Sequence, residues 1–150
     1  MSKISLEYNG ELRNKLTHLD SKTIISTDAP KDNNGKGDSF SPTDLVAASL
    51  AACMVTIINI NDRGGVYGIE YCNAEVEKIM YSKPRRISEI VITLEIKTTK
   101  ELSLHSKKNI LEIARNCPVA LSLNSQIIQN ISITFGYWLV PTDRKQHKKA

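Results

Sequence analysis

The sequence predicts an α+β protein, and three observations carry this prediction. Apolar residues alternate with polar ones in the first part and in the middle of the chain, which is typical of strands. A long apolar helix is predicted between these regions, and a shorter helical region precedes the last strand. The expected order is β-β-β-α-β-β-α-α-β in a single domain over residues 1–150, with residues 141–150 as a solvated tail.

The composition is that of an ordinary soluble protein. The chain has 150 residues, 41% hydrophobic and 24% charged, and is large enough to form a core without disulfide bonds or metal ions. The net charge of +4 is modest, and no basic stretch is interleaved with aromatic rings, so we expect no nucleic-acid binding. The N-terminus lacks the apolar run of a signal peptide, and the expected location is the cytoplasm.

The N-terminal region predicts a meander of three antiparallel strands. Ile4, Leu6 and Tyr8 alternate with polar residues, Asn9-Gly10 is a hairpin-turn signal, and a second turn is predicted near residue 20. Residues 28–40 are almost all turn formers and predict a long loop, and loops of this length are often functional.

A long apolar helix follows this loop, and the rest of the chain is organised around it. Ser41 and Asp44 fit a capping box around Pro42 at the first helical position. From Leu45 onward the residues are apolar or small on every side, so we expect this helix to be buried all round. The apolar run is shorter than the roughly 20 residues of a membrane span and contains hydroxyl groups, so we interpret it as a core helix. Cys53 lies near its middle.

The second half of the chain predicts a strand hairpin, two helices and a closing strand. The hairpin strands lie near residues 71–81 and 87–97, and the second has a face formed by Ile90, Ile92, Leu94 and Ile96. The first helix, with Leu104 among its apolar residues, is predicted from about residue 100 to residue 116, the second follows from Pro118, and the closing strand covers residues 127–140.

Three cysteines are candidates for reactive chemistry. The number of cysteines is odd and no CxxC pattern occurs among them, which argues against a disulfide scaffold; they are Cys53, Cys72 and Cys117. The three histidines are scattered without ligand spacing, so no metal site is expected. Cys117 precedes Pro118 and is predicted at a helix N-cap, where free N–H groups favour the thiolate. Cys53 needs a cation from elsewhere in the fold, and Cys72 fits the apolar face of its strand as a core residue.

Purely structural roles stay open for the same residues. A cysteine in a buried apolar helix is more often an inert small hydrophobe than a nucleophile. Asp44 is explained as a capping acid and Arg13 as a solvated strand residue. Cys53 and Cys117 are far apart in the sequence and can meet only in three dimensions, where one can resolve a sulfenic acid formed on the other.

Several segments of the chain resemble the OsmC/Ohr family of osmotically inducible and organic hydroperoxide resistance proteins. The resemblance extends over almost the whole sequence, and its most specific parts are Ala51-Ala-Cys53-Met54 and Asn116-Cys-Pro-Val119 taken together. The other matching segments are Gly10-Glu-Leu-Arg13, Thr27-Asp-Ala-Pro30, the helix start from Phe40 to Ala47, and Pro84-Arg-Arg86.

The resemblance implies an OsmC-like fold in which two chains form an intertwined homodimer. The cysteine-bearing helices are then packed centrally between antiparallel sheets, and the two active sites lie at the dimer interface. Such a dimer accounts for a helix without a polar face, because a second chain covers the side that a monomer of this size leaves exposed.

The resemblance also implies a thiol peroxidase mechanism that requires no metal or flavin cofactor. Cys53 matches the peroxidatic cysteine, which becomes a sulfenic acid, and Cys117 matches the resolving cysteine, which forms a disulfide that a dithiol reductant reduces. Arg13 matches an arginine that stabilises the thiolate. The family's partner glutamate follows the helix-start proline, where this chain has Thr43, and Asp44 next to it is the candidate that orients Arg13.

The function expected from this resemblance is hydroperoxide reduction in oxidative-stress defence. An apolar helix favours organic hydroperoxides, because a pocket lined by Leu, Val and Ile solvates an alkyl tail. The altered acidic position supports an alternative, a non-catalytic protein of the same fold that binds a small apolar ligand or acts as a redox sensor. A third hypothesis is a dimeric scaffold with accidental thiols.

Overall fold

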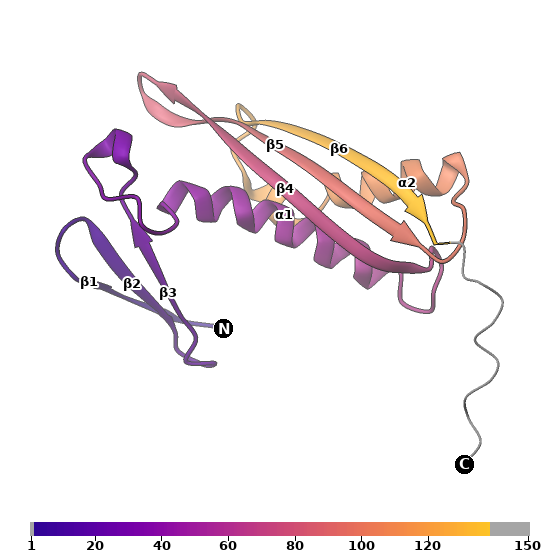
Figure 1. Ribbon diagram of the computed structural model, residues 1–150, viewed down its shortest axis with the longest axis horizontal. Coiled ribbons are helices and arrows are strands. Elements are labelled where there is room, and N and C mark those ends of the chain that lie inside the picture. The colour runs from indigo at the N-terminus through magenta and orange to yellow at the C-terminus, as the bar shows by residue number, and fades with distance from the viewer. Residues whose placement is uncertain (1, 139–150) are drawn as a thin grey trace, which may run out of the picture. The chain divides into compact units, whose positions relative to one another are not determined.

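The computed structural model describes residues 2–138 and confirms the predicted α+β order of elements (Figure 1). The predicted tail at residues 141–150 lies outside the described residues. The chain divides into two compact units, Met1–Ala48 and Ser49–Ala150, and helix α1 (Pro42–Asn61) is continuous through the division. A single domain over the whole chain stays a prediction.

The first unit contains a three-stranded antiparallel sheet in the order β1 (Ile4–Tyr8), β2 (Arg13–His18) and β3 (Ile24–Asp28). This confirms the predicted meander, although the first turn is longer than a two-residue Asn-Gly hairpin turn. It spans residues 9–12, and three consecutive residues within it have positive φ, namely Gly10, Glu11 and Leu12. The longer turn lets β2 begin at Arg13, which lies opposite Asp28 of β3.

The loop between β3 and α1 folds back tightly on itself. It contains a short 3-10 helix, η1 (Lys31–Asn33). Gly35 packs so closely against Ala29 that an added Cβ would lie 1.7 Å from the Ala29 carbonyl oxygen, so only glycine fits at this position. Further along, the Asp38 N–H donates to Asp28 Oδ2 at 3.0 Å, which returns the loop to the end of β3.

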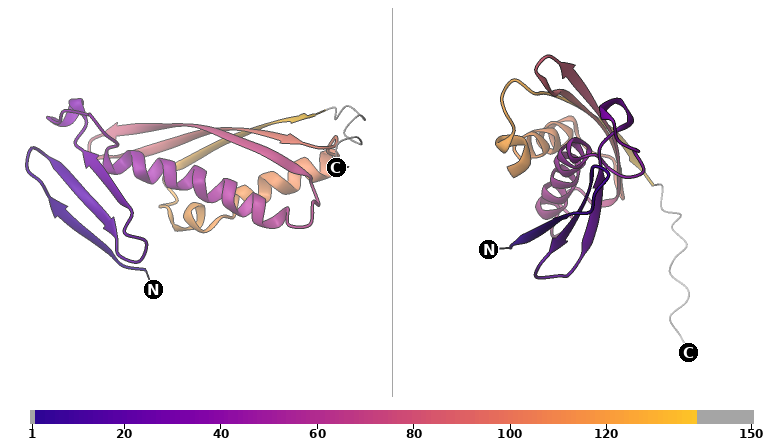
Figure 2. Two further views of the ribbon diagram at one scale, coloured as in Figure 1. Left: turned by 60° about the horizontal axis from the view of Figure 1, so that its bottom comes forward. Right: turned by 90° about the vertical axis from the view of Figure 1, so that its left-hand side faces the viewer.

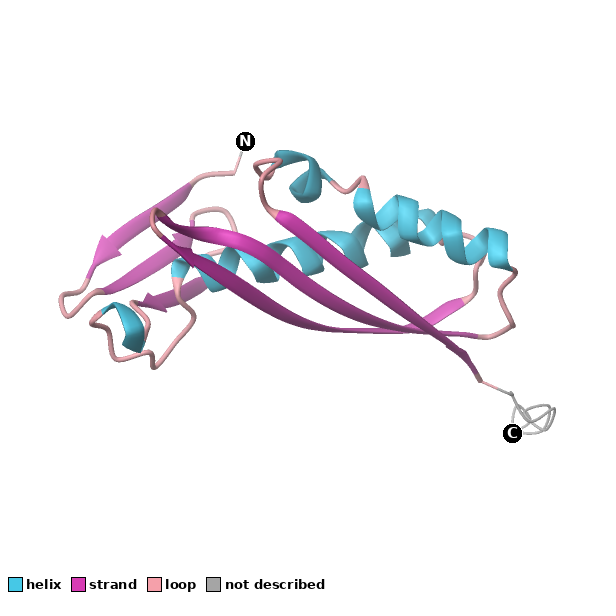
Figure 3. Ribbon diagram, turned by 90° about the horizontal axis from the view of Figure 1, so that it is seen from above, coloured by secondary structure: helices cyan, strands magenta, loops and turns pink. Residues whose placement is uncertain are grey.

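The second unit contains a sheet in the order β4 (Ile69–Ser82), β5 (Arg85–Thr98) and β6 (Ile128–Tyr137) (Figure 3). β4 and β5 form the predicted antiparallel hairpin, but β6 runs parallel to β5. The sheet is therefore mixed, whereas the resemblance implies antiparallel sheets. Helices α2 (Leu104–Arg115) and α3 (Pro118–Ser122) form the crossover that a parallel connection requires.

The core of the second unit lies between one face of this sheet and the helices that cover it. In both views of Figure 2, the part of α1 in this unit and α2 lie on the same face of the sheet. The predicted apolar face of β5 is confirmed, because all four of its members are fully buried. The fully buried apolar residues of these elements are Ile90, Ile92, Leu94 and Ile96 on β5, Leu50, Met54 and Ile58 on α1, and Ile110 on α2.

Helix α1 is buried along only one stripe in the single chain. The prediction that it is buried on every side is therefore wrong for the single chain. The buried stripe consists of Ala47, Leu50, Ala51, Met54 and Ile58, spaced three or four residues apart. Thr56 and Ile60 are exposed. By length and composition α1 is apolar enough to cross a membrane, but the core helix of a soluble protein passes the same test. The buried stripe supports the core interpretation.

Helix α2 is amphipathic as predicted, with one exception. Its buried residues are Ile110 and Ala114, one turn apart, whereas Leu104 is 70% exposed. Leu104 differs from the prediction because the helix begins there, after the Ser103 hydroxyl accepts a hydrogen bond from the Ser106 N–H. The preceding Leu102 is buried in its place.

One carboxylate organises the turn that joins α1 to β4. Asp62 accepts hydrogen bonds from three consecutive backbone N–H groups, at residues 67–69, with donor–acceptor distances of 2.6, 3.1 and 2.7 Å. The predicted glycine stop is confirmed by positive φ at Gly64 and Gly65. Asn109 of α2 donates to the Tyr67 hydroxyl at 2.7 Å, so the same turn also anchors α2.

Candidate active site

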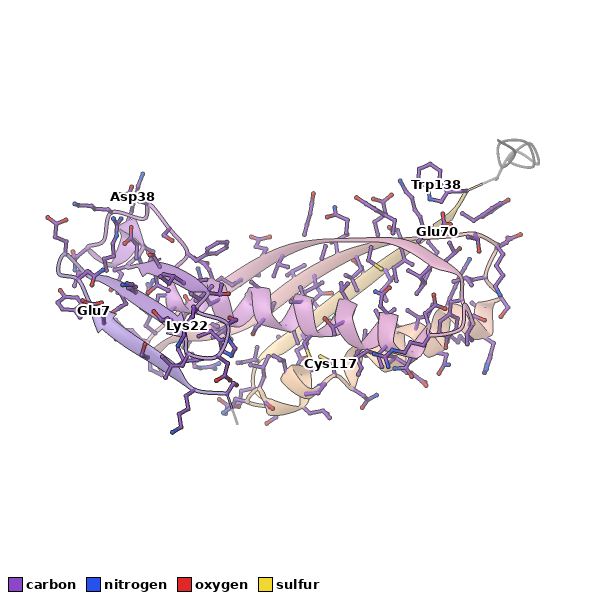
Figure 4. All side chains as sticks on the ribbon, turned by 90° about the horizontal axis from the view of Figure 1, so that it is seen from below. Glu7, Lys22, Asp38, Glu70, Cys117 and Trp138 are labelled. Carbon is purple, nitrogen blue, oxygen red and sulfur yellow. The ribbon has the colours of Figure 1, made fainter. Side chains whose placement is uncertain are left out.

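Cys117 lies at the N-cap of α3, as predicted from Pro118 at the first helical position. Its Sγ accepts a hydrogen bond from the Ala120 N–H at 3.4 Å. The side chain is fully buried, at 0% exposure. Figure 4 shows Cys117 on the second unit, next to α1.

The pKa of Cys117 is raised, although its position at a helix N-terminus favours the thiolate. Burial is the main cause, because removing a thiolate from water is costly. The neighbouring Cys53 raises the pKa further, through a side-chain hydrogen bond and its charge. Hydrogen bonds from the N–H groups of Ala120 and Val119 lower the pKa, as expected for an N-cap position, but their effect is smaller than the combined effect of burial and Cys53. Cys117 is therefore a neutral thiol at neutral pH.

The fold thus brings Cys53 and Cys117 within side-chain hydrogen-bonding reach. This interaction contributes to the raised pKa of Cys117. Cys53 is half-buried, next to the fully buried Met54, whereas Cys117 is completely enclosed. A reagent from solution therefore reaches Cys53 first, and a protonated thiol is in place for a second step.

Cys72 has different surroundings from this pair. It lies on β4 opposite Ile96 of β5 and is half-buried, so it is less enclosed than a core position. Asn59 Nδ2 of α1 donates to the Cys72 Sγ at 3.6 Å. Burial raises the pKa of Cys72, and this effect outweighs the opposite effect of the Asn59 hydrogen bond. The thiol is suited to packing between α1 and β4.

Arg13, in the first unit, is held by two carboxylates. Its Nε and Nη2 donate to Asp28 Oδ1 and Oδ2 at 2.6 and 2.7 Å, and Nη2 also reaches Asp38 Oδ2 at 3.4 Å. Asp28 is 2% exposed. The hydrogen bond from Arg13 is the main cause that lowers the pKa of Asp28, and the same bond raises the pKa of Arg13. The guanidinium is thereby fixed in a bidentate geometry.

Asp44 serves the start of helix α1. Its Oδ2 accepts from the Ser41 N–H at 2.7 Å, and its own N–H donates to Ser41 Oγ at 3.1 Å, which confirms the predicted capping box. The carboxylates bonded to Arg13 are Asp28 and Asp38. Asp28 was not identified from the sequence as the partner of Arg13. The register of β2 and β3, which places Asp28 opposite Arg13, is the feature that identifies it.

The fold and the thiol pair define an α+β protein with two apposed cysteines on adjacent helices. The family model described as OsmC-like protein matches residues 35–132, and the chain belongs to this family. A search of curated proteins finds no match.

Solved structures support the family assignment. A protein from Psychrobacter arcticus 273-4, named for an osmotic stress induced and detoxification response, is 44% identical, with a TM-score of 0.79 and coverage of 89% of this chain and 96% of that one. An organic hydroperoxide resistance protein OsmC from Legionella pneumophila is 17% identical (TM-score 0.69, coverage 89% and 96%). The organic hydroperoxide resistance protein OhrB of Bacillus subtilis is also 17% identical (TM-score 0.59, coverage 89% and 98%). The last two show likeness of fold.

Reaction with iodoacetamide at neutral pH is expected to alkylate Cys53 before Cys117. Cys117 is buried and its pKa is raised, so its thiolate fraction grows only as the pH rises above the ordinary pKa of a thiol. Peptide mapping of the alkylated cysteines over time measures both rates. In Cys53→Ser, which removes the charge and thiol of Cys53, we expect Cys117 to react faster than in the wild type. Equal rates at the two wild-type cysteines would contradict this description.

Asp28→Asn is expected to lower the free energy of unfolding at about pH 7 and to have a smaller effect at about pH 3, below the ordinary pKa of aspartate. The pKa of Asp28 is lowered in the folded chain, so its ionised form stabilises the fold above the ordinary pKa of aspartate. That contribution is lost as the pH falls through the lowered pKa. Urea unfolding at both pH values measures the difference. Asp38→Asn is the matched control with a smaller effect, because Asp38 is exposed, and equal losses at both pH values would rule out this electrostatic role of Asp28.

Proposed function

We propose that the protein is a cytoplasmic, cysteine-based hydroperoxide reductase that acts in oxidative-stress defence. Membership of the OsmC-like family, together with structural neighbours named for organic hydroperoxide resistance, supports a peroxide-related stress role. The single observation that carries the thiol mechanism is the apposition of a half-buried Cys53 and a fully buried Cys117.

Cys53 performs the first step in this proposal. Its thiolate attacks the terminal oxygen of the hydroperoxide, the O–O bond breaks, and the remaining alkoxide takes a proton and leaves as an alcohol. The sulfur loses two electrons and becomes a sulfenic acid. The half-buried position of Cys53 suits this role, because the residue is more exposed in the single chain than the enclosed Cys117.

Cys117 performs the second step. Its sulfur forms a bond with the Cys53 sulfur, and the sulfenic hydroxyl leaves with the thiol proton as water, which gives a Cys53–Cys117 disulfide. A dithiol reductant then restores both thiols by exchange. The raised pKa of Cys117 supports this assignment, because a neutral thiol at neutral pH is less reactive toward the peroxide itself and stays available for resolution.

Arg13 is proposed to supply the positive charge that favours the Cys53 thiolate, with Asp28 as the acid that orients it. The support is the bidentate contact between the two side chains, which holds the guanidinium in one orientation. Asp44 contributes indirectly in this proposal, by capping the helix that carries Cys53.

The same contacts favour a second candidate function. Two carboxylates offset the charge of Arg13, so its capacity to stabilise a thiolate is reduced. A chain with an unactivated Cys53 fits a non-catalytic OsmC-like protein that binds a small apolar ligand or senses redox state. The rate at which Cys53 reacts with cumene hydroperoxide separates the two functions, because an unactivated Cys53 reacts slowly with the peroxide.

A homodimer is part of the proposed function, and exposed apolar side chains support it. Ile4, Leu6 and Tyr8 lie on one face of β1 and are 66%, 63% and 60% exposed. The strand register places Leu16 beside Leu6, and the exposed Ile25 beside Leu16. Contiguous apolar surface of this kind marks a protein interface. A second copy of the chain is the occupant that the family resemblance implies.

Light scattering after size exclusion is expected to give twice the mass of the chain. Leu6→Glu places a charge on the apolar face of β1 and should shift the protein toward the monomer. Ser5→Glu is the matched control, because Ser5 lies on the opposite face of the same strand. A monomeric wild type would exclude the homodimer.

Cys53→Ser is expected to abolish turnover of cumene hydroperoxide, because the attacking sulfur is absent. After one equivalent of peroxide, intact mass analysis should show a loss of two hydrogens in the wild type, mapped to a Cys53–Cys117 bridge. Cys117→Ser should gain one oxygen and form no bridge, and Cys72→Ser serves as a control that behaves like the wild type. Full activity of Cys53→Ser would refute the mechanism.

A faster reaction with cumene hydroperoxide than with hydrogen peroxide would support the organic substrate class.

A further inference from the structure

Helix α3, which carries Cys117 at its N-cap, is too short to hold its own position. It spans only Pro118–Ser122, and an isolated helix of this length is unstable in water. Its carbonyl groups near the C-terminal end also require hydrogen-bond partners from outside the helix. The position of the Cys117 sulfur therefore depends on the contacts that tie α3 to the rest of the second unit.

Gln129 of β6 provides such a contact. Its Nε2 donates to the Ala120 carbonyl oxygen at 3.0 Å. Ala120 is the residue whose N–H donates to the Cys117 Sγ, so both interactions converge on one buried residue of α3. Within residues 2–138, this is the one hydrogen bond that joins α3 to a strand of the sheet.

The position of Gln129 on the strand is unusual for its residue type. Alternate residues of β6 face the helices, and those that follow Gln129 on this face are apolar: Ile131, Ile133 and Phe135. Gln129 therefore begins an otherwise apolar run on the helix-facing side of β6, and the next residue on this face with a polar group is Tyr137 at the far end of the strand. It pairs with the fully buried Ile90 of β5, which places it beside the core of the second unit. A half-buried amide on an apolar face costs stability unless it is hydrogen-bonded, and its bond goes to α3.

We propose that Gln129 is a positioning residue that holds α3 so that the Cys117 sulfur faces Cys53 when the disulfide forms. A disulfide demands a narrow geometry, with an S–S bond of about 2.05 Å, so a small displacement of α3 separates the reacting atoms. This inference rests on the pairing of Cys53 with Cys117 in the proposed function. It adds a residue that the family resemblance does not assign.

The first experiment measures how readily Cys53 and Cys117 form a disulfide in the absence of peroxide. In glutathione redox buffers the Cys53 thiolate attacks oxidised glutathione and releases one glutathione thiolate, and Cys117 then displaces the second. The equilibrium gives the effective concentration of the two protein thiols. Gln129→Met and Gln129→Glu keep the side-chain length and lose the N–H donor, and in both we expect an effective concentration about tenfold lower than in the wild type.

Asn130→Ala is the matched control. Asn130 is the next residue of β6, on the exposed face, where its amide donates to Glu89. It should leave the effective concentration unchanged, and thermal melting of all variants shows whether any is unfolded. Wild-type values in both Gln129 variants would overturn the inference, and so would an equal decrease in Asn130→Ala.

The second experiment separates the two steps of the peroxide reaction. With cumene hydroperoxide, dimedone trapping measures formation of the Cys53 sulfenic acid, and mass analysis measures disulfide closure. Gln129→Met should form the sulfenic acid at the wild-type rate and close the disulfide about tenfold more slowly, whereas a general structural defect slows both steps. If the wild type forms no sulfenic acid, the proposed function fails, and the glutathione measurement still decides the role of Gln129.

Discussion

The apolar contact between the buried stripe of α1 and the isoleucine-rich face of β5 is the constraint on which the candidate site depends. Leu50, Met54 and Ile58 are fully buried, as are the alternating residues of β5. Burial of each large apolar side chain is worth about 1.5–3 kcal/mol, so rotation of the helix is strongly disfavoured. Cys53 directly precedes Met54 and is therefore held at the edge of the packed stripe, half-buried.

This constraint gives the two thiols different environments, although both belong to one site. Cys117 is enclosed, and its pKa is raised because burial outweighs the helix N-terminal N–H groups. Cys53 neighbours Cys117 and has the more open position. In the proposed mechanism, this asymmetry assigns the attack on the peroxide to the more open sulfur and the resolving step to the enclosed one.

Two acidic residues of the N-terminal region have different structural roles. Asp44 closes the capping box of α1 with Ser41, and Asp28 fixes the guanidinium of Arg13. The family pattern has a glutamate directly after the helix-start proline, where this chain has Thr43. In this chain the acid is Asp44, one position later, where it serves as the capping carboxylate. The partner of Arg13 is instead its cross-strand neighbour Asp28.

Local features of this protein could be read from the sequence, and contacts between distant segments could not. The order of elements, the buried face of β5, the capping box at Ser41 and the N-cap position of Cys117 were predictable, because they depend on periodicity and on residues a few positions apart. The partner of Arg13 depends on the register of β2 and β3, and the parallel pairing of β6 depends on the crossover through α2 and α3. The raised pKa of Cys117 and the contact of Gln129 with α3 were likewise decided by the tertiary structure, because burial and hydrogen bonding between remote elements exist only after the chain has packed.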